Sequence, residues 1–438
     1  MPDAGLTSPR EGGDHGGGTP PWPQPRRRPF GIGPPVSAFT LGTMRALESP
    51  GQMADVLEAA VAAGINHVET APAYGPAEAF LGEALRRLAQ RDPASRRDLV
   101  LTSKLLPSFG LERGKEQLRA LLERLAIPRL DNLAVHGLNT PEHLRWALRG
   151  AGRELLAWAL GEGLVGQVGF SSHGSTPLIE QALASGRFRF CSLHLHLFDP
   201  ERLPLARAAL ADGIGVMAIS PADKGGRLYD PPAELLADCA PFHPLELAYR
   251  FLLDQGISTL TLGAAQPGDL AWARVIMGGF AGEGGCVHPS PDSPSPDSPD
   301  GRAGPGSSAS AAAGLASGSW LDAAQRLALE RLAARGRERL GESRCGQCRQ
   351  CLPCPNELPI PALLRLRNLA VGHGMVPFAS ERYSLIGRAG HWWEQVDASA
   401  CLRCGDCLPR CPLQLPIPDL LADTHRRLAA PPRRRLWD

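Results

Sequence analysis

Lysine is scarce in this chain of 438 residues, in which only Lys104, Lys115 and Lys224 occur. A motif that requires lysine is therefore rarely matched by chance. The net charge is only +1, from 46 basic and 45 acidic residues, and this balance gives no indication of a nucleic-acid-binding surface. No apolar run reaches the roughly 18 residues that a membrane span needs. The Pro- and Gly-rich residues 1–29 contain no apolar segment typical of a secretory signal. We expect a soluble, cytoplasmic protein that binds neither nucleic acid nor membranes.

The cysteines are numerous, but they are not spread through the chain as in a disulfide framework. Eight of the eleven lie in two short runs near the C-terminus. In a chain of this size, such runs are typical of metal binding in a reducing compartment. The other three, Cys191, Cys239 and Cys286, are scattered, and we interpret them as small buried residues or linker thiols.

Two stretches, residues 1–29 and 281–319, contain little that could be buried in a core. The second alternates Pro, Ser and Gly, and both are predicted to be disordered. They delimit a region at 30–280 and another at 320–438. The latter opens with "WLDAAQRLALERLAARGRERLGESR", in which apolar residues recur every three or four positions, and it is predicted to be helical.

Between residues 30 and 280, short apolar runs alternate with amphipathic segments. The strand-like runs are "VSAFTLG", "NHVET", "LVLTSKL", "LDNLAVHG", "LVGQVGFS", "FCSLHLHLF", "GIGVMAIS" and "ISTLTLG". Eight strand–helix units in about 250 residues predict an α/β fold of the TIM (β/α)8 barrel type. The rival, a doubly wound open sheet, is disfavoured because no Gly-x-Gly-x-x-Gly follows the first run.

Each cysteine run places its thiols at nearly regular intervals, and a proline follows the last. Three cysteines at Cys-x-x-Cys-x-x-Cys spacing can bind three irons of one iron–sulfur cube, and a fourth before proline ligates the other cluster in two-cluster ferredoxins. The runs are Cys345, Cys348, Cys351 and Cys354, then Cys401, Cys404, Cys407 and Cys411. Structural zinc needs no third equally spaced cysteine. We therefore expect two 4Fe–4S clusters in a helical ferredoxin-like domain, with one cluster or zinc as the alternatives.

The spacing suggests which cysteines share a cluster. Crosswise pairing would join the first three thiols of one run with Cys411, and the first three of the other with Cys354. The first run is one residue shorter before its fourth cysteine, so this assignment stays open.

Four chemically reactive residues lie at or just beyond the ends of three successive predicted strands. Glu69 ends the second, with Tyr74 soon after it, Lys104 ends the third, and His136 ends the fourth. The carboxyl ends of barrel strands form the face that carries active sites. Taken singly, a lysine at a strand end is usually solvated, and a tyrosine or histidine usually packs. Their joint occurrence predicts an active site.

These residues make region 30–280 resemble the aldo-keto reductase family, and the cysteine-rich tail resembles the branch with a C-terminal ferredoxin-type domain. The resemblance implies that Tyr74 is the general acid that protonates a carbonyl oxygen while a nicotinamide donates hydride. Lys104 would lower the pKa of Tyr74. His136 would orient the carbonyl group, and Glu69 would hold Lys104. The family usually has aspartate where this chain has Glu69. The ion pair with Lys104 is therefore expected to be shifted or weaker.

The resemblance also suggests contacts to the nicotinamide. "GFSSHG" is similar to the family segment whose side chains bind the carboxamide, which here are Ser171 and Ser172. Ser192 occupies the position at which the family often has glutamine. In "SLHLHLF", Ser192, His194 and His196 share one strand face and are predicted to point into the barrel. They are either ligands of a metal or substrate, or hydrogen-bonded interior groups.

The phosphate-binding positions match the family less well. "AISPADKGGRL" resembles its phosphate-binding loop, with Ser220 as the candidate contact, but no aromatic residue lies near Ile219. Gly263 stands where basic residues often bind the 2′-phosphate, and Asp269 where arginine often stands. The cofactor is therefore expected to be NADPH or NADH, without strict preference for NADPH.

The sequence predicts an oxidoreductase with an aldo-keto reductase-like barrel that reduces a small carbonyl substrate, joined to a domain with two 4Fe–4S clusters for electron transfer. The alternative is a catalytically weak barrel that serves as an iron–sulfur electron-transfer or binding module. Residues 320–438 contain 18 arginines and 12 acidic residues. This local excess suggests an acidic electron-transfer partner such as a ferredoxin or flavodoxin.

Overall fold

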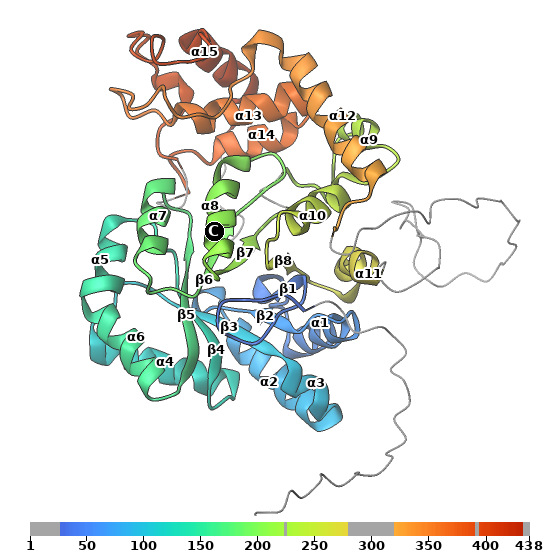
Figure 1. Cartoon of the computed structure of the whole chain (residues 1–438), viewed down its shortest axis with the longest axis vertical. Coiled ribbons are helices and arrows are strands. Elements are labelled where there is room, and N and C mark those ends of the chain that lie inside the picture. The colour runs from blue at the N-terminus through green and yellow to red at the C-terminus, as the bar shows by residue number, and fades with distance from the viewer. Residues whose placement is uncertain (1–26, 223–225, 279–318, 390–393, 432–438) are drawn as a thin grey trace, which may run out of the picture.

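The predicted barrel is present in a computed structural model that describes residues 27–222, 226–278, 319–389 and 394–431 (Figure 1). Eight parallel strands pair in chain order, and the last pairs with the first, so the sheet is closed. The strands are β1 (Phe39–Gly42), β2 (His67–Glu69), β3 (Val100–Leu105), β4 (Leu130–Val135), β5 (Val165–Ser172), β6 (Phe190–His194), β7 (Gly215–Ile219) and β8 (Thr259–Gly263). Seven lie within the runs that the sequence indicates, and β5 extends one residue beyond its run, to Ser172.

Helices surround the barrel, as the strand–helix alternation predicts. They are α1 (Pro50–Ala62), α2 (Ala77–Arg91), α3 (Pro93–Asp98), α4 (Leu111–Leu125), α5 (Pro141–Arg149), α6 (Ala151–Gly161), α7 (Thr176–Ala184), α8 (Leu203–Ala211), α9 (Ala233–Cys239), α10 (Pro244–Asp254) and α11 (Ala271–Gly278). Short 3₁₀ turns follow several strands, namely η1 (Thr43–Arg45), η2 (Pro72–Tyr74), η3 (Pro200–Arg202) and η4 (Pro267–Leu270).

Local chemistry explains where these helices begin and end. Ser49 caps α1 by accepting a hydrogen bond from the Gln52 amide, with proline at the first helical position. The sequence pattern between β4 and β5 is helical up to Leu160, and the structure divides this stretch into two helices, α5 and α6, which meet at Gly150. Glycine is the poorest helix former after proline, so a break at this position costs little.

The interior of the barrel is more polar than a TIM barrel built from branched apolar layers. His67 lies at its centre and hydrogen-bonds to the hydroxyls of Thr40 and Thr102, both at 2.7 Å. Phe30, from the segment that precedes β1, packs against His67 and Phe190, with ring centroids 5.2 and 5.1 Å away. This segment therefore closes the end of the barrel opposite to the carboxyl ends of the strands.

The C-terminal region is helical, as predicted. It contains α12 (Ala323–Leu340), α13 (Ile360–His373), α14 (Val376–Ser384) and α15 (Ile417–Leu428), with the short turns η5 (Gly341–Ser343) and η7 (Ala398–Ala400). Asp322 caps α12 in a capping box with Gln325. Figure 1 shows these helices, in orange and red, grouped beyond α8 and α9 on one side of the barrel.

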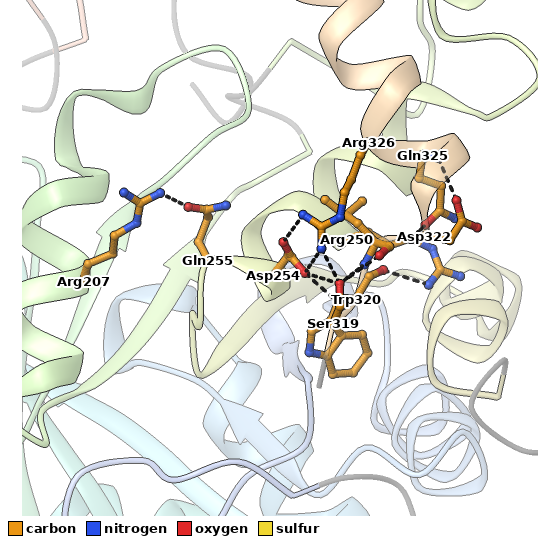
Figure 2. Close-up of polar contacts among 10 residues, drawn as sticks. Arg207, Arg250, Asp254, Gln255, Ser319, Trp320, Asp322, Gln325 and Arg326 are labelled. Carbon is orange, nitrogen blue, oxygen red and sulfur yellow. Dashed lines mark hydrogen bonds and ion pairs between the residues drawn. The ribbon is translucent and has the colours of Figure 1, made fainter. Parts of the chain in front are cut away.

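The start of the helical region is fixed to α10, as Figure 2 shows. Asp254, at the end of α10, accepts hydrogen bonds from the Ser319 hydroxyl at 2.7 Å and the Trp320 amide at 3.0 Å. Arg326 of α12 forms an ion pair with the same carboxylate at 3.2 Å. The end of α10 is thus tied both to residues 319–320 and to α12.

Ion pairs also join the helical region to loops at the carboxyl ends of β6 and β7. Arg349 pairs with Glu201 at 3.1 Å. Arg227 pairs with Glu381 of α14 at 2.8 Å. Since these loops form the face on which barrels carry their sites, the helical region lies beside that face.

Two of the predictions fall largely on residues that are not described. The predicted linker at 281–319 lies outside the described residues except for Ser319, and the N-terminal tail does so up to residue 26. Among the helices that are described, none has both the length and the apolar character needed to cross a membrane.

Candidate functional site

The four residues predicted to be catalytic come together at the carboxyl ends of β2, β3 and β4. Glu69 ends β2, Lys104 lies near the end of β3, and His136 directly follows β4. Tyr74 ends η2, the turn that follows β2. Neighbouring parallel strands bring these ends side by side, which is why residues far apart in sequence meet here.

An ion pair between Glu69 and Lys104 is the most buried part of this group. The Glu69 carboxylate contacts the Lys104 ammonium, and both side chains are almost fully buried, at 4 and 2% exposure. Lys104 Nζ also donates to the Tyr74 hydroxyl at 2.8 Å and to the Thr70 carbonyl oxygen at 3.1 Å. Tyr74 in turn donates to Glu69 Oε1 at 3.2 Å. The phenol is therefore held between an ammonium and a carboxylate.

His136 completes the group above the ion pair. Its ring stands edge-on to that of Tyr74, with centroids 6.0 Å apart. Both side chains are partly exposed, whereas Glu69 and Lys104 are buried. A molecule at this face would therefore meet a phenol and an imidazole, with the charged pair beneath them.

Burial controls the ionisation of this group. Burial lowers the pKa of Lys104 well below its usual value. Burial, with a contribution from the Lys104 charge, lowers the pKa of His136 to about 3, so this imidazole is neutral at physiological pH. A neutral imidazole can donate or accept one hydrogen bond at each nitrogen without carrying charge.

Burial raises the pKa of the Tyr74 phenol, and this effect opposes the lowering expected from Lys104, which stays a prediction. The hydrogen bond from Tyr74 to Glu69 acts in the same direction, because it stabilises the protonated phenol. This contact was not predicted, because it depends on how far the glutamate side chain reaches.

Ser171 and Ser172 contact the backbone of the loop that carries His136. The Ser171 hydroxyl accepts from the Gly137 amide at 3.0 Å. The Ser172 hydroxyl donates to the Leu138 carbonyl oxygen at 2.6 Å. In the described structure, these two serines hold the loop after β4 in place, and their predicted contact with a carboxamide stays a prediction.

Two buried polar atoms near this loop have no hydrogen-bond partner among the described residues. They are the Asn139 side-chain nitrogen and the Ser192 hydroxyl. The Asn139 oxygen accepts from the His173 amide at 2.7 Å, which fixes the direction in which its nitrogen points. Buried polar atoms are rarely left without partners, so these atoms suggest a place for a polar ligand group. Asn139 was not predicted; its only signal in the sequence is its place three residues after His136.

His194, at the end of β6, contacts a histidine that the sequence did not single out. Its Nε2 lies 2.6 Å from Nδ1 of His173, which follows β5. The His196 ring lies 5.7 Å from that of His194. No three His, Cys, Asp or Glu side chains in the described parts of the chain are arranged to hold a metal ion, so a histidine metal site is not supported here.

The ends of β7 and β8 carry the remaining predicted contacts. Ser220 follows β7 with a φ of 51°, a left-handed conformation that is uncommon for residues other than glycine. Gly263 ends β8 and is exposed, and the side chain of Arg45 lies against it. Asp269 bonds to backbone amides of the β8 loop: its Oδ2 accepts from Ala265 at 2.8 Å and from Gln266 at 3.2 Å.

The two cysteine runs lie next to each other and exchange contacts. Cys354, the last cysteine of the first run, lines a cavity together with Cys401, Cys404 and Cys407. The Asn356 side chain donates to the Ala400 carbonyl oxygen at 2.6 Å, and this bond ties the end of one run to the start of the other.

The thiol neighbours follow the same crosswise pattern. Burial raises the pKa of Cys345, and Cys348 and Cys411 are close enough to raise it further. Burial likewise raises the pKa of Cys407, which has Cys401, Cys404 and Cys354 among its neighbours. Cys354 is thus placed near Cys401, Cys404 and Cys407, and Cys411 near Cys345.

An internal repeat accompanies the runs and was missed in the sequence. Residues 354–364 read "CPNELPIPALL" and residues 411–421 read "CPLQLPIPDLL", identical at eight of eleven positions. The second residue after the repeated Cys-Pro pair has a positive φ in both copies, 55° at Glu357 and 52° at Gln414. The copies lead into α13 and α15, each with Ile-Pro as its first two residues. Self-similarity at an offset of 57 residues was the signal that could have revealed it.

Known proteins resemble the barrel segment. Residues 38–266 match the sequence profile of the aldo/keto reductase family. The uncharacterized oxidoreductase YtbE of Bacillus subtilis strain 168 is 28% identical over 234 residues, which cover 51% of this chain and 77% of YtbE. The 6-dehydroglucose reductase of Novosphingobium aromaticivorans is 29% identical over 216 residues, which cover 45% of this chain and 68% of that protein.

Solved structures show a likeness of the same extent. An aldo-keto reductase from Bacillus halodurans, in its holo form, has a TM-score of 0.48 and 20% identity, covering 57% of this chain and 90% of its own. A Bombyx mori aldo-keto reductase in complex with NADP has a TM-score of 0.46 and 18% identity, covering 57% and 87%. The family profile ends at residue 266, before the cysteine runs.

Proposed function

Because this chain belongs to the aldo/keto reductase family through residues 38–266, and is therefore an oxidoreductase, we propose that its barrel reduces a carbonyl compound by hydride transfer from NADPH or NADH. The observation that carries the proposal is the hydrogen bond of 2.8 Å from the Lys104 ammonium to the Tyr74 hydroxyl, with Glu69 beneath and His136 beside them.

Each residue of this group has a distinct role in the proposed reaction. When bound, a reduced nicotinamide would supply a hydride to the carbonyl carbon. Tyr74 would give its phenolic proton to the carbonyl oxygen, so that the products would be an alcohol and the oxidised nucleotide. Lys104 stabilises the phenolate that remains, through its bond to the hydroxyl oxygen. Neutral His136 donates a hydrogen bond that orients the carbonyl oxygen.

The barrel offers polar atoms that suit a nicotinamide carboxamide, which both donates and accepts hydrogen bonds. The Asn139 nitrogen and the Ser192 hydroxyl are buried and lack partners among the described residues. We propose that they bind this group, together with Ser171 and Ser172 after local rearrangement of their hydroxyls.

Nucleotide titration and one variant test the barrel's function. We expect NADPH or NADH to quench tryptophan fluorescence at micromolar concentration. Tyr74→Phe should retain this binding and lose at least about 100-fold in kcat for carbonyl reduction, because it lacks the proton donor. Absence of binding at millimolar nucleotide would reject the nicotinamide reaction. It would favour the alternative of a catalytically weak barrel, to which the bond between Tyr74 and Glu69 already points.

We further propose that the helical region holds two 4Fe–4S clusters. The donor set fits, because each run supplies three thiols, Cys354 lies near those of the second run, and Cys411 lies near Cys345 of the first. Each thiolate of such a cluster would bind a different iron. In the described residues, no three of these side chains are arranged to hold a single metal ion.

The backbone of both runs supports this assignment. Gln347 and Arg349 in the first run, and Arg403 and Gly405 in the second, all have positive φ at matching positions. Alternation of right- and left-handed residues turns successive amides toward one point, a concavity that favours anionic groups, including iron–sulfur centres. Three of the four are not glycine, so the strain of this conformation indicates a functional constraint.

Iron and sulfide counts on anaerobically purified protein test the clusters. We expect roughly eight irons and eight sulfides per chain. A zinc content with no sulfide would reject them.

We also propose, from the arginine excess of residues 320–438, that an acidic ferredoxin or flavodoxin exchanges electrons with the clusters. Its association should weaken as salt is added, and an association insensitive to salt would contradict this.

A further inference from the structure

Arg45, which follows the first strand of the barrel, occupies the space beside the end of the last strand, β8. Because the barrel is closed, the end of β1 lies beside that of β8, and Gly42 pairs with Gly263. Arg45, at the end of η1, lies across Gly263. A Cβ atom at Gly263 would stand only 3.1 Å from Arg45 Cδ and 3.3 Å from its Nε. The missing side chain at Gly263 thus makes room for the stem of this arginine.

The guanidinium group of Arg45 is available to an anion. The residue is exposed, and within the described parts of the chain no carboxylate forms an ion pair with it. Its guanidinium carbon lies 5.8 Å from the ring centroid of Tyr229, an exposed aromatic in the loop after β7. This contact directs the side chain across the ends of β7, β8 and β1.

The backbone amides of the β8 loop are less available to an anion than the Arg45 guanidinium. The amides of Ala265 and Gln266 already donate to the Asp269 carboxylate at 2.8 and 3.2 Å. A phosphate at this place would have to displace that carboxylate. In TIM barrels, the loops after β7 and β8 frequently bind phosphate. Here the Arg45 side chain, and not the backbone amides of the β8 loop, is in position to bind a phosphate.

We propose that Arg45 binds a phosphate group of the nicotinamide nucleotide, and that it supplies from the β1 loop the positive charge that the β8 loop lacks. The inference rests on the proposed use of NADPH or NADH. The phosphate is either the pyrophosphate that both nucleotides share or the 2′-phosphate of NADPH. A guanidinium suits either, because its planar donors match phosphate oxygens.

The test compares the binding of NADPH and NADH to the full chain by calorimetry, for wild type, Arg45→Gln and Arg45→Lys. We expect Arg45→Gln to raise Kd by about tenfold or more, as loss of a charge-assisted hydrogen bond predicts, and Arg45→Lys to restore part of the affinity. Added salt should weaken wild-type binding more than binding by Arg45→Gln. Arg86→Gln, which changes an exposed arginine on α2, is the control and should leave Kd unchanged.

The outcomes separate the two proposals. Loss of affinity for both nucleotides supports a contact with the pyrophosphate, and loss for NADPH alone supports a contact with the 2′-phosphate. Equal affinities in wild type and Arg45→Gln for both nucleotides would overturn the role of Arg45 and leave the proposed function intact. If wild type binds neither nucleotide, the proposed nicotinamide reaction fails, and this inference fails with it.

Discussion

At the scale of single residues, the length of Glu69 sets the environment of the candidate acid. Its carboxylate reaches both the Lys104 ammonium and the Tyr74 hydroxyl, to which it is 3.2 Å distant. A carboxylate that accepts from a phenol stabilises the phenol and opposes its ionisation. The ammonium acts in the opposite sense. The extra methylene therefore weakens the activation that Lys104 alone would provide.

Shortening the Glu69 side chain should remove its hydrogen bond with the Tyr74 phenol and so lower the pKa of Tyr74. We expect Glu69→Asp to lower the pKa of Tyr74 by about one unit or more, because the carboxylate loses its contact with the hydroxyl and Lys104 keeps its own. The acid must be protonated, so the alkaline limb of kcat/KM should move to lower pH. Ultraviolet difference titration of the tyrosines measures the pKa directly, and subtraction of the Tyr74→Phe curve assigns it among only four tyrosines.

The sign of the change decides between two roles for Glu69. A pKa of Tyr74 that is unchanged or higher in Glu69→Asp would show that the carboxylate only holds Lys104. Glu69→Gln is the matched variant, because it keeps the length and removes the charge. It should also lower the pKa of Tyr74, since the negative charge beside the phenol disappears.

His67 gives the barrel a dependence on pH that is independent of the active site. Burial lowers its pKa to about 3, against about 6.5 in an unfolded chain. Between these values the unfolded chain binds a proton that the folded chain does not. The contribution of neutral His67 to the free energy of unfolding is therefore fully present above pH 6.5. It falls as the pH drops below this value, by roughly 1.4 kcal/mol per pH unit.

Replacement of His67 should flatten this dependence. We expect the free energy of unfolding of His67→Gln to fall less steeply than that of wild type between pH 6.5 and 5, even where the variant is less stable at every pH. Urea denaturation at several pH values measures both slopes. The difference of slopes isolates His67 from other histidines with lowered pKa values, such as His136 and His373. Parallel curves would contradict the assignment.

At the scale of elements, the strands and the meeting of the catalytic group could be predicted, because both follow from local pattern. An apolar run that ends in Glu69, Lys104 or His136 fixes where that side chain lies once the strands are parallel. The contacts of Asn139 and Arg45 could not be predicted in this way. They depend on the reach and direction of side chains in loops, which neither periodicity nor spacing encodes. The turn at Gly150 was missed because its flanks are both strongly helical.

The packing of α12 on α9 includes a buried carboxylate, beside an ion pair of 2.9 Å between Arg339 and the more exposed Glu234. Asp238 of α9 is 6% exposed and bonds to Arg339 of α12, with one N–O distance of 3.0 Å. Arg339→Ala should lower the free energy of unfolding by about 2–4 kcal/mol, because it leaves a buried charge without its main partner. Thermal and urea unfolding measure the loss. Arg335→Ala on the same helix removes an exposed pair with Glu338 and should cost less than about 0.5 kcal/mol. Equal effects of the two variants would contradict the role of Asp238.

At the scale of the whole molecule, the helical region is built from two similar halves that interlock. Each half consists of a cysteine run, the repeated segment and the helix that follows it. Burial alternates in the same order in both runs, with Cys348 and Cys404 exposed and Cys351 and Cys407 buried. An arrangement of this kind places the fourth cysteine of each half across the boundary. The ligands of one proposed cluster then come from both halves, so neither half would hold a complete set alone.

Double variants can establish whether the fourth cysteines cross. Cys354→Ser alone should remove or weaken one cluster, with the loss of up to roughly four irons per chain. With crosswise pairing, Cys354 serves the same cluster as Cys404, so the double variant Cys354→Ser/Cys404→Ser should lose no more iron than Cys404→Ser alone. Cys354→Ser combined with Cys348→Ser should lose both clusters.

Pairing within each run reverses these results, because Cys354 would then share a cluster with Cys348. In that case Cys354→Ser/Cys348→Ser would lose one cluster, and Cys354→Ser/Cys404→Ser would lose both. Cys286→Ser, outside both runs, is the control and should keep the full iron content. The placement of Cys354 in a cavity with Cys401, Cys404 and Cys407 favours the crosswise result. Iron and sulfide counts decide it without reference to the activity of the barrel.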